Sequence, residues 1–532
     1  MTQYDYVIAG AGAAGCTLAY RLSADPSLRI ALIEAGPRDN HPFIKMPKGL
    51  IKVMADPKHL WAYSSKPEGS TSDKSEVWVR GRVLGGSSSI NGMMYVRGQP
   101  ADFDAIAQLS SDDWSWEHIG KAYRDFENHP LGEDETRGGN GPLRLSLPTL
   151  RDKVSEAQIA AGEQMGWPVK KDVNQPDNDD GIGYAPRTIH KGKRQSASVA
   201  FLREAEDRPN LDVLVEATVD RVVFDGRRAV GVEILRGGKR EVIQAGKEVV
   251  ICGGAMASPA ILERSGIGHA ALLEPMGIDM VHHSPEVGEG LLEHRGLIMQ
   301  WKVRPGYSQN QEYSGWRLLR SVAKYYLTGD GPMSSAAYEI GAWFKTRPGL
   351  NRADAQALIG PYSFDFDKQR MELEKFPGIN AVVYPLRPTS RGSIHIATRD
   401  PDIAAEFSPN HRDTEEDRKA MVGSVHVMRE WARQPALRDI IVEETMPGPA
   451  YQSDEEILRS YDEFGTCGYH AVGSCRMGSD PASVVDPALR VRGVEGLRVI
   501  DTSIMPIVPS GNTNGPTMAM AWRAADIILR DA

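Results

Sequence analysis

The stretch Gly10-Ala11-Gly12-Ala13-Ala14-Gly15 has the spacing of a dinucleotide-binding turn, in which glycines let the backbone approach a pyrophosphate. Tyr6–Ala9 precedes it as an apolar run, and Ala14–Ser23 follows it with many Ala and Leu residues, so we expect a buried strand, a turn and a helix. A second strand is expected at Arg29–Glu34. Its acidic end lies 19 residues after the last glycine, where a carboxylate can bind an adenosine ribose. This context favours a nucleotide site over a bare tight turn, with Gly10, Gly12, Gly15 and Glu34 as its first residues.

The bulk composition is that of an ordinary soluble globular protein of 532 residues, with 41% hydrophobic and 25% charged residues. A net charge of −9 argues against a nucleic-acid partner, because phosphate binding favours a basic face. No stretch approaches the roughly 18 apolar residues of a membrane-spanning helix, so no integral membrane segment is expected. The first residues lack a basic and an apolar region typical of a secretory signal, which predicts a cytoplasmic protein and leaves peripheral membrane attachment open.

The sequence gives no pattern typical of a metal site. The four cysteines, Cys16, Cys252, Cys467 and Cys475, follow no zinc spacing and are too few for a disulfide framework, so we expect reduced thiols. Two polar stretches are expected to be loops, residues 131–142 and 172–183. The second superficially resembles a calcium loop, but Pro176 occupies its fifth position and no glutamate closes its twelfth. No metal is therefore expected.

A second glycine-rich motif is Gly81-Arg82-Val83-Leu84-Gly85-Gly86-Ser87-Ser88-Ser89-Ile90-Asn91-Gly92. Adjacent glycines let backbone N–H groups approach a ligand, and the serines add small donors. Further strands are expected at 211–215, 219–224 and 248–252, and a final helix at about 517–529. Aromatic residues are dense from 297 to about 446, which indicates a second, substrate-facing domain, although most aromatics serve as core. They are Trp301, Trp316, Tyr325, Tyr326, Trp343, Tyr362, Phe364 and Phe366.

Near the C-terminus, Tyr469-His470 and Gly511-Asn512-Thr513-Asn514 carry groups suited to proton transfer. Histidine supplies a base of near-neutral pKa, and an amide can hold an oxygen and steady developing negative charge without competing for the proton.

These motifs, together with Gly254–Gly268 and His470–Gly478, occur in order along the chain and resemble the glucose-methanol-choline (GMC) oxidoreductase family. The chain looks most similar to bacterial alcohol, choline and sorbose dehydrogenases. The resemblance implies an α/β fold, α+β overall, in which a Rossmann-like FAD-binding domain is interleaved with an antiparallel-sheet substrate-binding domain. It divides the chain into residues 1–150, 205–296 and 465–532 for FAD and residues 151–204 and 297–464 for substrate. It also implies FAD-dependent oxidation of a primary or secondary alcohol to an aldehyde or ketone by hydride transfer to the flavin.

The resemblance assigns His470 as the general base and gives Asn514 the second catalytic position, although a structural histidine and a helix-capping asparagine are the plainer alternatives. It places Val219 at the adenine, through its backbone, and Asp501, Asn512 and Thr513 along the other side of the flavin. The residues expected to wrap the pyrophosphate and flavin ring are Gly85, Gly86, Ser87, Asn91, Gly92 and Met94.

Two departures from the family pattern bear on function. Ile90 stands where members with covalently attached flavin have a histidine, so FAD is expected to bind noncovalently. In the loop 287–294, Gly290, Leu292 and Glu293 replace the Asn, Gln and Asp that relatives commonly carry. Because this loop borders the active-site entrance in the family, we expect an unusual entry route or substrate preference.

Several alternatives stay open at this point. The electron acceptor can be a quinone, another carrier or O2; a dehydrogenase is preferred over an oxidase because of the resemblance. A hydroxynitrile lyase of the same fold would keep flavin only as a structural element. A nicotinamide-dependent reductase would use the first glycine motif but leave the second unexplained, and a non-enzymatic binding protein is disfavoured by His470 and Asn514 in their motifs.

Overall fold

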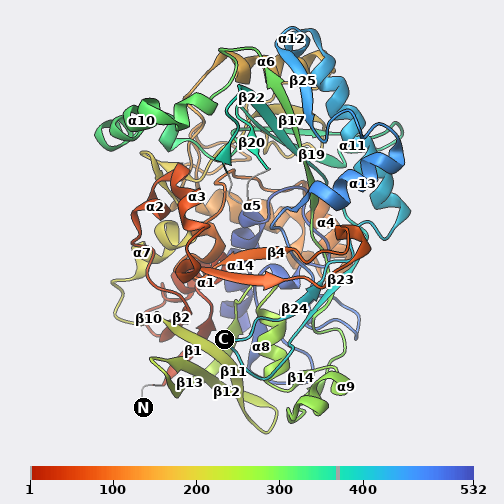
Figure 1. The fold of residues 1–532 in the computed structure, drawn as a ribbon. Helices are drawn as coiled ribbons and strands as arrows, with labels where there is room; N and C mark the ends of the chain where they lie inside the picture. Colours follow the sequence, from red (N-terminus) through yellow and green to blue (C-terminus); the bar gives the residue numbers. More distant parts are fainter. Residues whose placement is uncertain (1–2, 367–371, 532) are drawn as a thin grey trace.

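A computed structural model describes residues 3–366 and 372–531. The first glycine motif lies at the centre of a seven-stranded sheet, at the bottom of Figure 1. Its order is β10-β2-β1-β13-β12-β11, with β27 beside β13. The strands around the glycine turn run parallel: β1 (Tyr4–Ala9), β2 (Ile30–Ile33), β10 (Leu211–Leu214), β27 (Leu497–Val499) and the end of β13 (Lys239–Ile251). The predicted strand, turn and helix are confirmed, since α1 (Ala13–Leu22) follows the turn directly.

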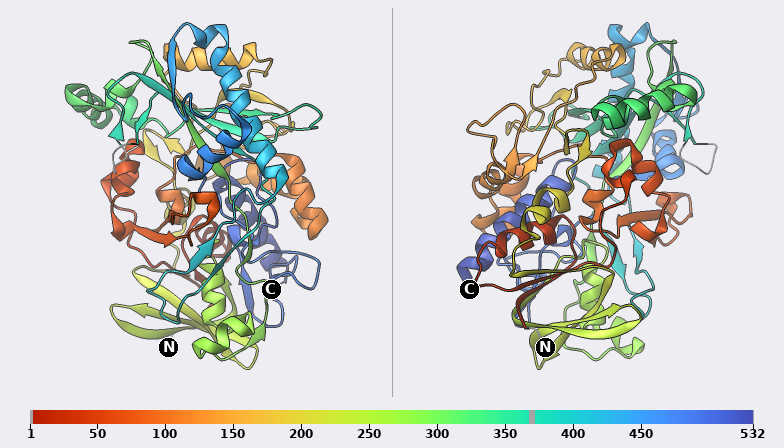
Figure 2. Two further views of the ribbon diagram at one scale, coloured as in Figure 1. Left: turned by 45° about the vertical axis from the view of Figure 1, so that its right-hand side comes forward. Right: turned by 90° about the vertical axis from the view of Figure 1, so that its left-hand side faces the viewer.

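The glycine turn owes its shape to close contacts between backbones. A Cβ on Gly15 would lie 1.9 Å from the carbonyl oxygen of Gly10, so only glycine lets α1 approach β1. Gly10 itself has φ +112° and would place a Cβ 2.4 Å from the carbonyl oxygen of Cys252. The last helix, α14 (Asn514–Asp531), packs against α1, and the two run side by side in Figure 2.

The strand expected at 248–252 is the end of a longer one. β13 has 13 residues, and its first part pairs antiparallel with β12 (Arg228–Arg236), which pairs with β11 (Ala217–Asp225). Its polar first half extends beyond the parallel core, where burial is lower. β13 therefore joins the parallel layer to an antiparallel meander.

A second seven-stranded sheet, antiparallel throughout, lies at the opposite end of the molecule (Figure 1). Its order is β25-β17-β22-β19-β18-β7, with β26 beside β17. α6 (Lys153–Gln164), α11 (Glu415–Arg433) and α13 (Asp454–Phe464) contribute to its core, in which Trp301 lies edge-on to Trp431. The strands are β7 (Gly181–Tyr184), β17 (Arg295–Val303), β18 (Ile340–Phe344), β19 (Ala355–Gly360), β22 (Gly378–Pro385), β25 (Ile441–Met446) and β26 (Gly465–Cys467).

Further helices and strands lie around the two sheets. They include α2 (Pro42–Lys45), the 3-10 turn η1 (Pro47–Gly49), α3 (Leu50–Val53), β3 (Leu60–Ser64), β4 (Val77–Gly81), α4 (Pro100–Leu109), α5 (Trp116–Phe126), α8 (Ser258–Arg264), α9 (Ala270–Leu273) and α10 (Gly315–Thr328). The strands of the first sheet all fall in the ranges assigned to the FAD-binding domain. β26 belongs to the second sheet, although residues 465–532 were assigned to the first domain. The division into two domains remains a prediction.

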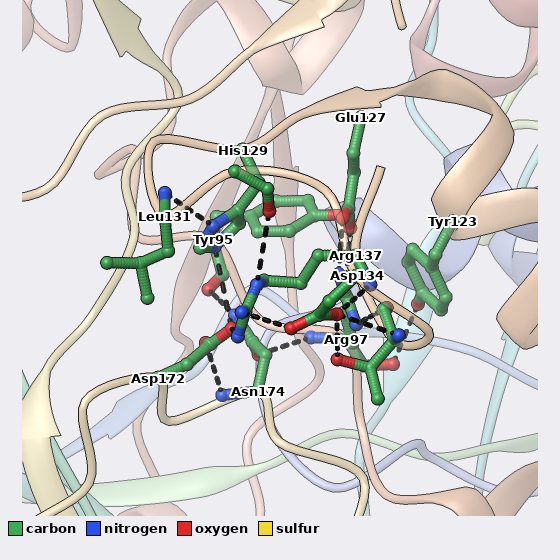
Figure 3. Close-up of polar contacts among 12 residues, drawn as sticks. Tyr95, Arg97, Tyr123, Glu127, His129, Leu131, Asp134, Arg137, Asp172 and Asn174 are labelled. Carbon is green, nitrogen blue, oxygen red and sulfur yellow. Dashed lines mark hydrogen bonds and ion pairs between the residues drawn. The ribbon is translucent and has the colours of Figure 1, made fainter. Parts of the chain in front are cut away.

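The two polar stretches are tied together by a buried ion network, drawn in Figure 3. Nε of Arg97 donates to Glu127 at 2.7 Å, and its backbone N–H donates to Oδ1 of Asn174 at 2.9 Å. Asp172, the first residue of the calcium-like stretch, lies 3.4 Å from Arg137 and 3.5 Å from His129. The stretch 172–183 was expected to be a loop throughout, but β7 begins at Gly181, so its last residues join the second sheet.

Within the described ranges, no three or more His, Cys, Asp or Glu side chains come together as a group able to hold a metal ion. None of the helices built from these residues is both long enough and apolar enough to cross a membrane.

Candidate active site

A cavity of about 1000 Å³ lies between the two sheets and collects residues from both ends of the chain. All the residues predicted to bind the cofactor or to act in catalysis contribute to its wall except Gly15 and Gly85. Those two act on the backbone beneath it: Gly15 admits α1, and Gly85, at φ +85°, donates its N–H to the carbonyl of Ala11 at 2.8 Å. The lining residues are Gly10, Gly12, Glu34, Gly86, Ser87, Asn91, Gly92, Met94, Val219, His470, Asp501, Asn512, Thr513 and Asn514.

The end of the cavity formed by Gly12, Glu34 and Gly86, called here the nucleotide end, is open where a phosphate group would need space. A Cβ on Gly12 would meet no protein atom within 4 Å, in contrast to Gly10 and Gly15. Gly12 is the N-cap of α1, a ten-residue helix whose cap makes no side-chain hydrogen bond. The first N–H groups of such a helix, and its dipole, favour an anion.

Glu34 lies at the same end and is buried. Its carboxylate accepts hydrogen bonds from the N–H groups of Ala11, at 3.1 Å, and Gly36, at 2.9 Å. Burial outweighs these bonds and raises the pKa of Glu34 to about 7. The carboxylate thus braces the glycine turn while it faces the cavity with unused lone pairs.

The second glycine motif is held from behind by a buried arginine. Gly86 packs against Gly12, since a Cβ there would lie 2.8 Å from the Cα of Gly12. Nη1 of Arg194 donates to the carbonyl of Ser88 at 3.2 Å and to the carbonyl and side-chain oxygens of Asn91 at 2.8 Å. Burial lowers the pKa of Arg194 to about 9. Nothing in the local sequence pattern pointed to Arg194.

Two further predicted residues complete this end of the cavity. Val219 lies on β11, the edge strand of its sheet, beside a break in register, so part of its backbone is not used in strand pairing. The Asp501 carboxylate accepts from the N–H groups of Gly254, at 2.9 Å, and Ser503, at 2.7 Å. It thereby joins the turn after β13 to the C-terminal segment.

His470 stands at the end of a hydrogen-bond chain whose directions are fixed. Nε2 of His294 lies 2.9 Å from the carbonyl oxygen of Leu386, which can only accept, so this nitrogen carries a proton. Burial holds the pKa of His294 at about 4, so the ring is neutral and its Nδ1 is an acceptor. Nδ1 of His470, 2.9 Å away, is therefore the donor.

The chain leaves Nε2 of His470 unprotonated. Burial, with the nearby His294 and Arg80, holds the pKa of His470 well below its usual range, so this ring is also neutral. Nδ2 of Asn512 donates to Nε2 at 3.0 Å. A neutral imidazole whose Nε2 lone pair accepts a hydrogen bond from Asn512 thus lies in the cavity wall, in the unprotonated state that a general base requires.

Glu293 fixes the backbone of both histidines. Its carboxylate accepts from the N–H of His470, at 2.7 Å, and from the N–H of His294, at 2.8 Å, and it lies 3.6 Å from Arg80. Burial raises the pKa of Glu293 above its usual range. The loop 287–294 was expected to border the entrance, and this was wrong: no residue of it lines the cavity, and its last two residues are buried behind His470.

The two asparagines differ in what they leave free. Oδ1 of Asn512 is buried without a hydrogen-bond partner, while its Nδ2 contacts His470. Asn514, the first residue of α14, lines the cavity, and no protein partner is found for its amide within the described ranges. Sequence reasoning paired His470 with Asn514, whereas the asparagine in direct contact is Asn512.

The aromatic residues that indicated a second, substrate-facing domain divide into two sets. Tyr326, Tyr362, Phe364 and Phe366 line the cavity. Trp301 and Trp343 are buried in the second sheet and Tyr325 in a small cluster beside α10, whereas Trp316 is largely exposed.

These residues fit FAD. The open space at Gly12, the uncapped start of α1 and the carboxylate of Glu34 suit a pyrophosphate and a ribose. The orphaned Oδ1 of Asn512 suits a donor on a ligand, because a buried acceptor without a partner costs free energy.

Comparison with known proteins shows the family to which the chain belongs. Models of the GMC oxidoreductase family match residues 4–295 and 388–521, and the chain belongs to this family. An alcohol dehydrogenase (acceptor) of Pseudomonas putida is 36% identical over 99% of this chain and 96% of its own length. Mitochondrial choline dehydrogenase of Homo sapiens is 38% identical over 99% of this chain and 90% of its own. The crystal structure of pyridoxine 4-oxidase from Mesorbium loti superposes with a TM-score of 0.90 at 27% identity, covering 99% of both chains.

Proposed function

We propose that this protein oxidises a primary or secondary alcohol to the aldehyde or ketone, with FAD as hydride acceptor and His470 as general base. The observation that carries the proposal is the chain from Leu386 through His294, which leaves Nε2 of His470 unprotonated at the cavity wall. Membership of the GMC oxidoreductase family and the likeness to an alcohol dehydrogenase support the class of reaction.

Bound FAD supplies an acceptor for the two electrons and the hydrogen that leave the carbinol carbon as a hydride. The glycine turn around Gly12 and the motif around Gly86 would hold its pyrophosphate, and Glu34 its ribose. Ile90 lines the cavity with an alkyl side chain, which forms no bond to a flavin, so FAD is held noncovalently.

The side chains of the protein take up the proton of the alcohol. The hydroxyl of the alcohol replaces Nδ2 of Asn512 as the donor to Nε2 of His470, and its proton passes to Nε2 as the carbonyl forms. Nδ1–H of His470 keeps its bond to His294, which stabilises the imidazolium. The free amide of Asn514 holds the alcohol oxygen as negative charge develops there.

Turnover requires a second substrate that accepts the two electrons. We place a quinone or another carrier ahead of O2, because two similar proteins are named alcohol dehydrogenase (acceptor) and choline dehydrogenase, whereas others of similar identity are named oxygen-dependent choline dehydrogenases and make O2 the second candidate. We also propose a cytoplasmic location.

An anaerobic panel of aliphatic, aromatic, sugar and amino alcohols tests the function. We expect at least one alcohol to bleach the yellow absorbance of the enzyme and to yield the corresponding carbonyl compound. If no alcohol bleaches it while a cyanohydrin is cleaved, the lyase alternative replaces this proposal. Adding O2 or a quinone dye to the bleached enzyme then identifies the acceptor.

A further inference from the structure

Lys48 places a positive charge inside the cavity, on the side away from the nucleotide end. It belongs to the 3-10 turn η1 and lines the cavity with its neighbours. Its ammonium donates to the carbonyl of Ala336 at 2.8 Å and lies 4.7 Å from the ring centroid of Tyr362 and 5.4 Å from that of Tyr313. The ammonium is thus held between aromatic faces, which favour a cation.

One wall of the cavity links this lysine to the base. Tyr384 lies edge-on to His470 at 5.7 Å, and Val382, two residues earlier on β22, shares its face of the sheet. Leu358 lies opposite Val382 on β19, and the chain continues from that strand to Tyr362 beneath Lys48. Each of these four side chains lines the cavity. A substrate whose hydroxyl lies on His470 therefore extends toward Lys48.

The carboxylates of the cavity wall lie elsewhere. In the part of the chain that the structure describes, Glu34 and Asp501 are the acidic lining residues, and both are engaged by backbone N–H groups at the nucleotide end. Glu339, which acts electrostatically on Lys48, pairs with Arg187 and does not line the cavity. The substrate side of the cavity thus carries the cation of Lys48, and none of the described lining residues there is an anion that could neutralise a positive charge on the substrate.

We propose, on the basis of the alcohol oxidation proposed above, that Lys48 sets the substrate class. The enzyme acts on alcohols without a positive charge and discriminates against quaternary-ammonium alcohols such as choline, the substrate in the name of one similar protein. For a separation of about 10 Å between the two like charges, an effective dielectric of about 20 corresponds to binding that is weaker by about tenfold.

A matched pair of alcohols tests this. Choline and 3,3-dimethylbutan-1-ol have the same shape, but choline has a positively charged nitrogen where the other alcohol has an uncharged carbon. We expect the holoenzyme to prefer the neutral alcohol at least about tenfold. The preference should appear in the ratio of the rate constant of flavin bleaching to Kd, and also in Kd itself, which is measured from the change in the flavin spectrum on binding. Lys48→Met removes the charge at similar length and should reduce the preference about tenfold. Lys52→Met is the control, because Lys52 is an exposed lining residue of the same segment.

The wild-type enzyme gives an independent measurement if Lys48→Met fails to fold. Burial lowers the pKa of Lys48 to about 8, with Glu339 opposing and Arg187 adding to the shift. The preference should therefore shrink as pH rises through about 8, while the contribution of His470 cancels in the ratio. Equal use of both alcohols, an unchanged preference in Lys48→Met, or a ratio independent of pH overturns the role of Lys48. Failure of every alcohol to bleach the flavin overturns the proposed function, and this inference with it.

Discussion

Replacing His294 isolates the part of the mechanism that depends on the tautomer of His470. His294→Phe keeps a ring in the buried site but removes the acceptor that lies 2.9 Å from Nδ1 of His470. The proton on Nδ1 then has no partner, and Nε2 loses its enforced lone pair. His294→Asn is the matched variant, since its side-chain oxygen can occupy the place of Nδ1 and accept the same bond.

The magnitude follows from the bond that is lost. In the reaction His470 becomes an imidazolium, and a hydrogen bond from a charged donor is worth about 1.5 to 3 kcal/mol. At 25 °C this corresponds to a slowing of flavin reduction by roughly 10- to 150-fold. Substrate Kd should change little, because His294 does not line the cavity. His294→Asn should recover part of the loss.

Anaerobic stopped-flow absorbance measures the rate, and the flavin-to-protein ratio of each variant controls for FAD loss. A His294→Phe enzyme that reduces its flavin at the parental rate would refute the chain of hydrogen bonds. Equal rates in the two variants, both slow and fully loaded with FAD, would show that an acceptor at this position does not restore the rate, and would contradict the role given to the hydrogen bond.

Three further predictions concern the cofactor. Gly12→Ala should purify folded but with low FAD occupancy, because its methyl meets no protein atom, whereas Gly15→Ala should lose thermal stability, because its methyl would overlap the carbonyl of Gly10. FAD should bind the apoprotein more tightly at pH 8 than at pH 6. Burial raises the pKa of Glu34 to about 7, and the hydroxyl donors of the ribose favour the ionised carboxylate, so FAD binding releases protons. Glu34→Gln is the control, and its affinity for FAD should not change over this pH range. Acid precipitation should release all the FAD, since Ile90 forms no bond to it, and a yellow pellet would contradict noncovalent attachment.

The nucleotide end of the site could be predicted because its signals are local. Strand, glycine turn, helix and acid follow one another within about thirty residues, and each carries its own pattern, so β1, α1 and β2 appear where the sequence places them. The extent of β13 could not be predicted in the same way. Its first half is polar and half-exposed, and it becomes a strand by pairing with β12 rather than by its own periodicity.

The substrate end depends on contacts between residues far apart in the chain. His294 and His470 are 176 residues apart, and only the fold brings their Nδ1 atoms together. The sequence singled out the loop that contains His294 for its departures from the family pattern, but not for its position behind the base. Lys48 carries no motif at all, and its importance comes from the aromatic rings that the fold gathers around it.

The central claim is that His470 takes the proton of the alcohol, and anaerobic stopped-flow reduction of His470→Ala tests it most directly. With FAD fully bound, the variant should reduce its flavin on the order of a hundredfold to ten-thousandfold more slowly than the parent, the usual worth of general acid–base catalysis. The parental rate should stay constant as pH falls through the range in which an ordinary histidine titrates and decline only in more acidic solution, because burial holds the pKa of His470 well below its usual range. A His470→Ala enzyme that reduces its flavin at the parental rate would contradict the account.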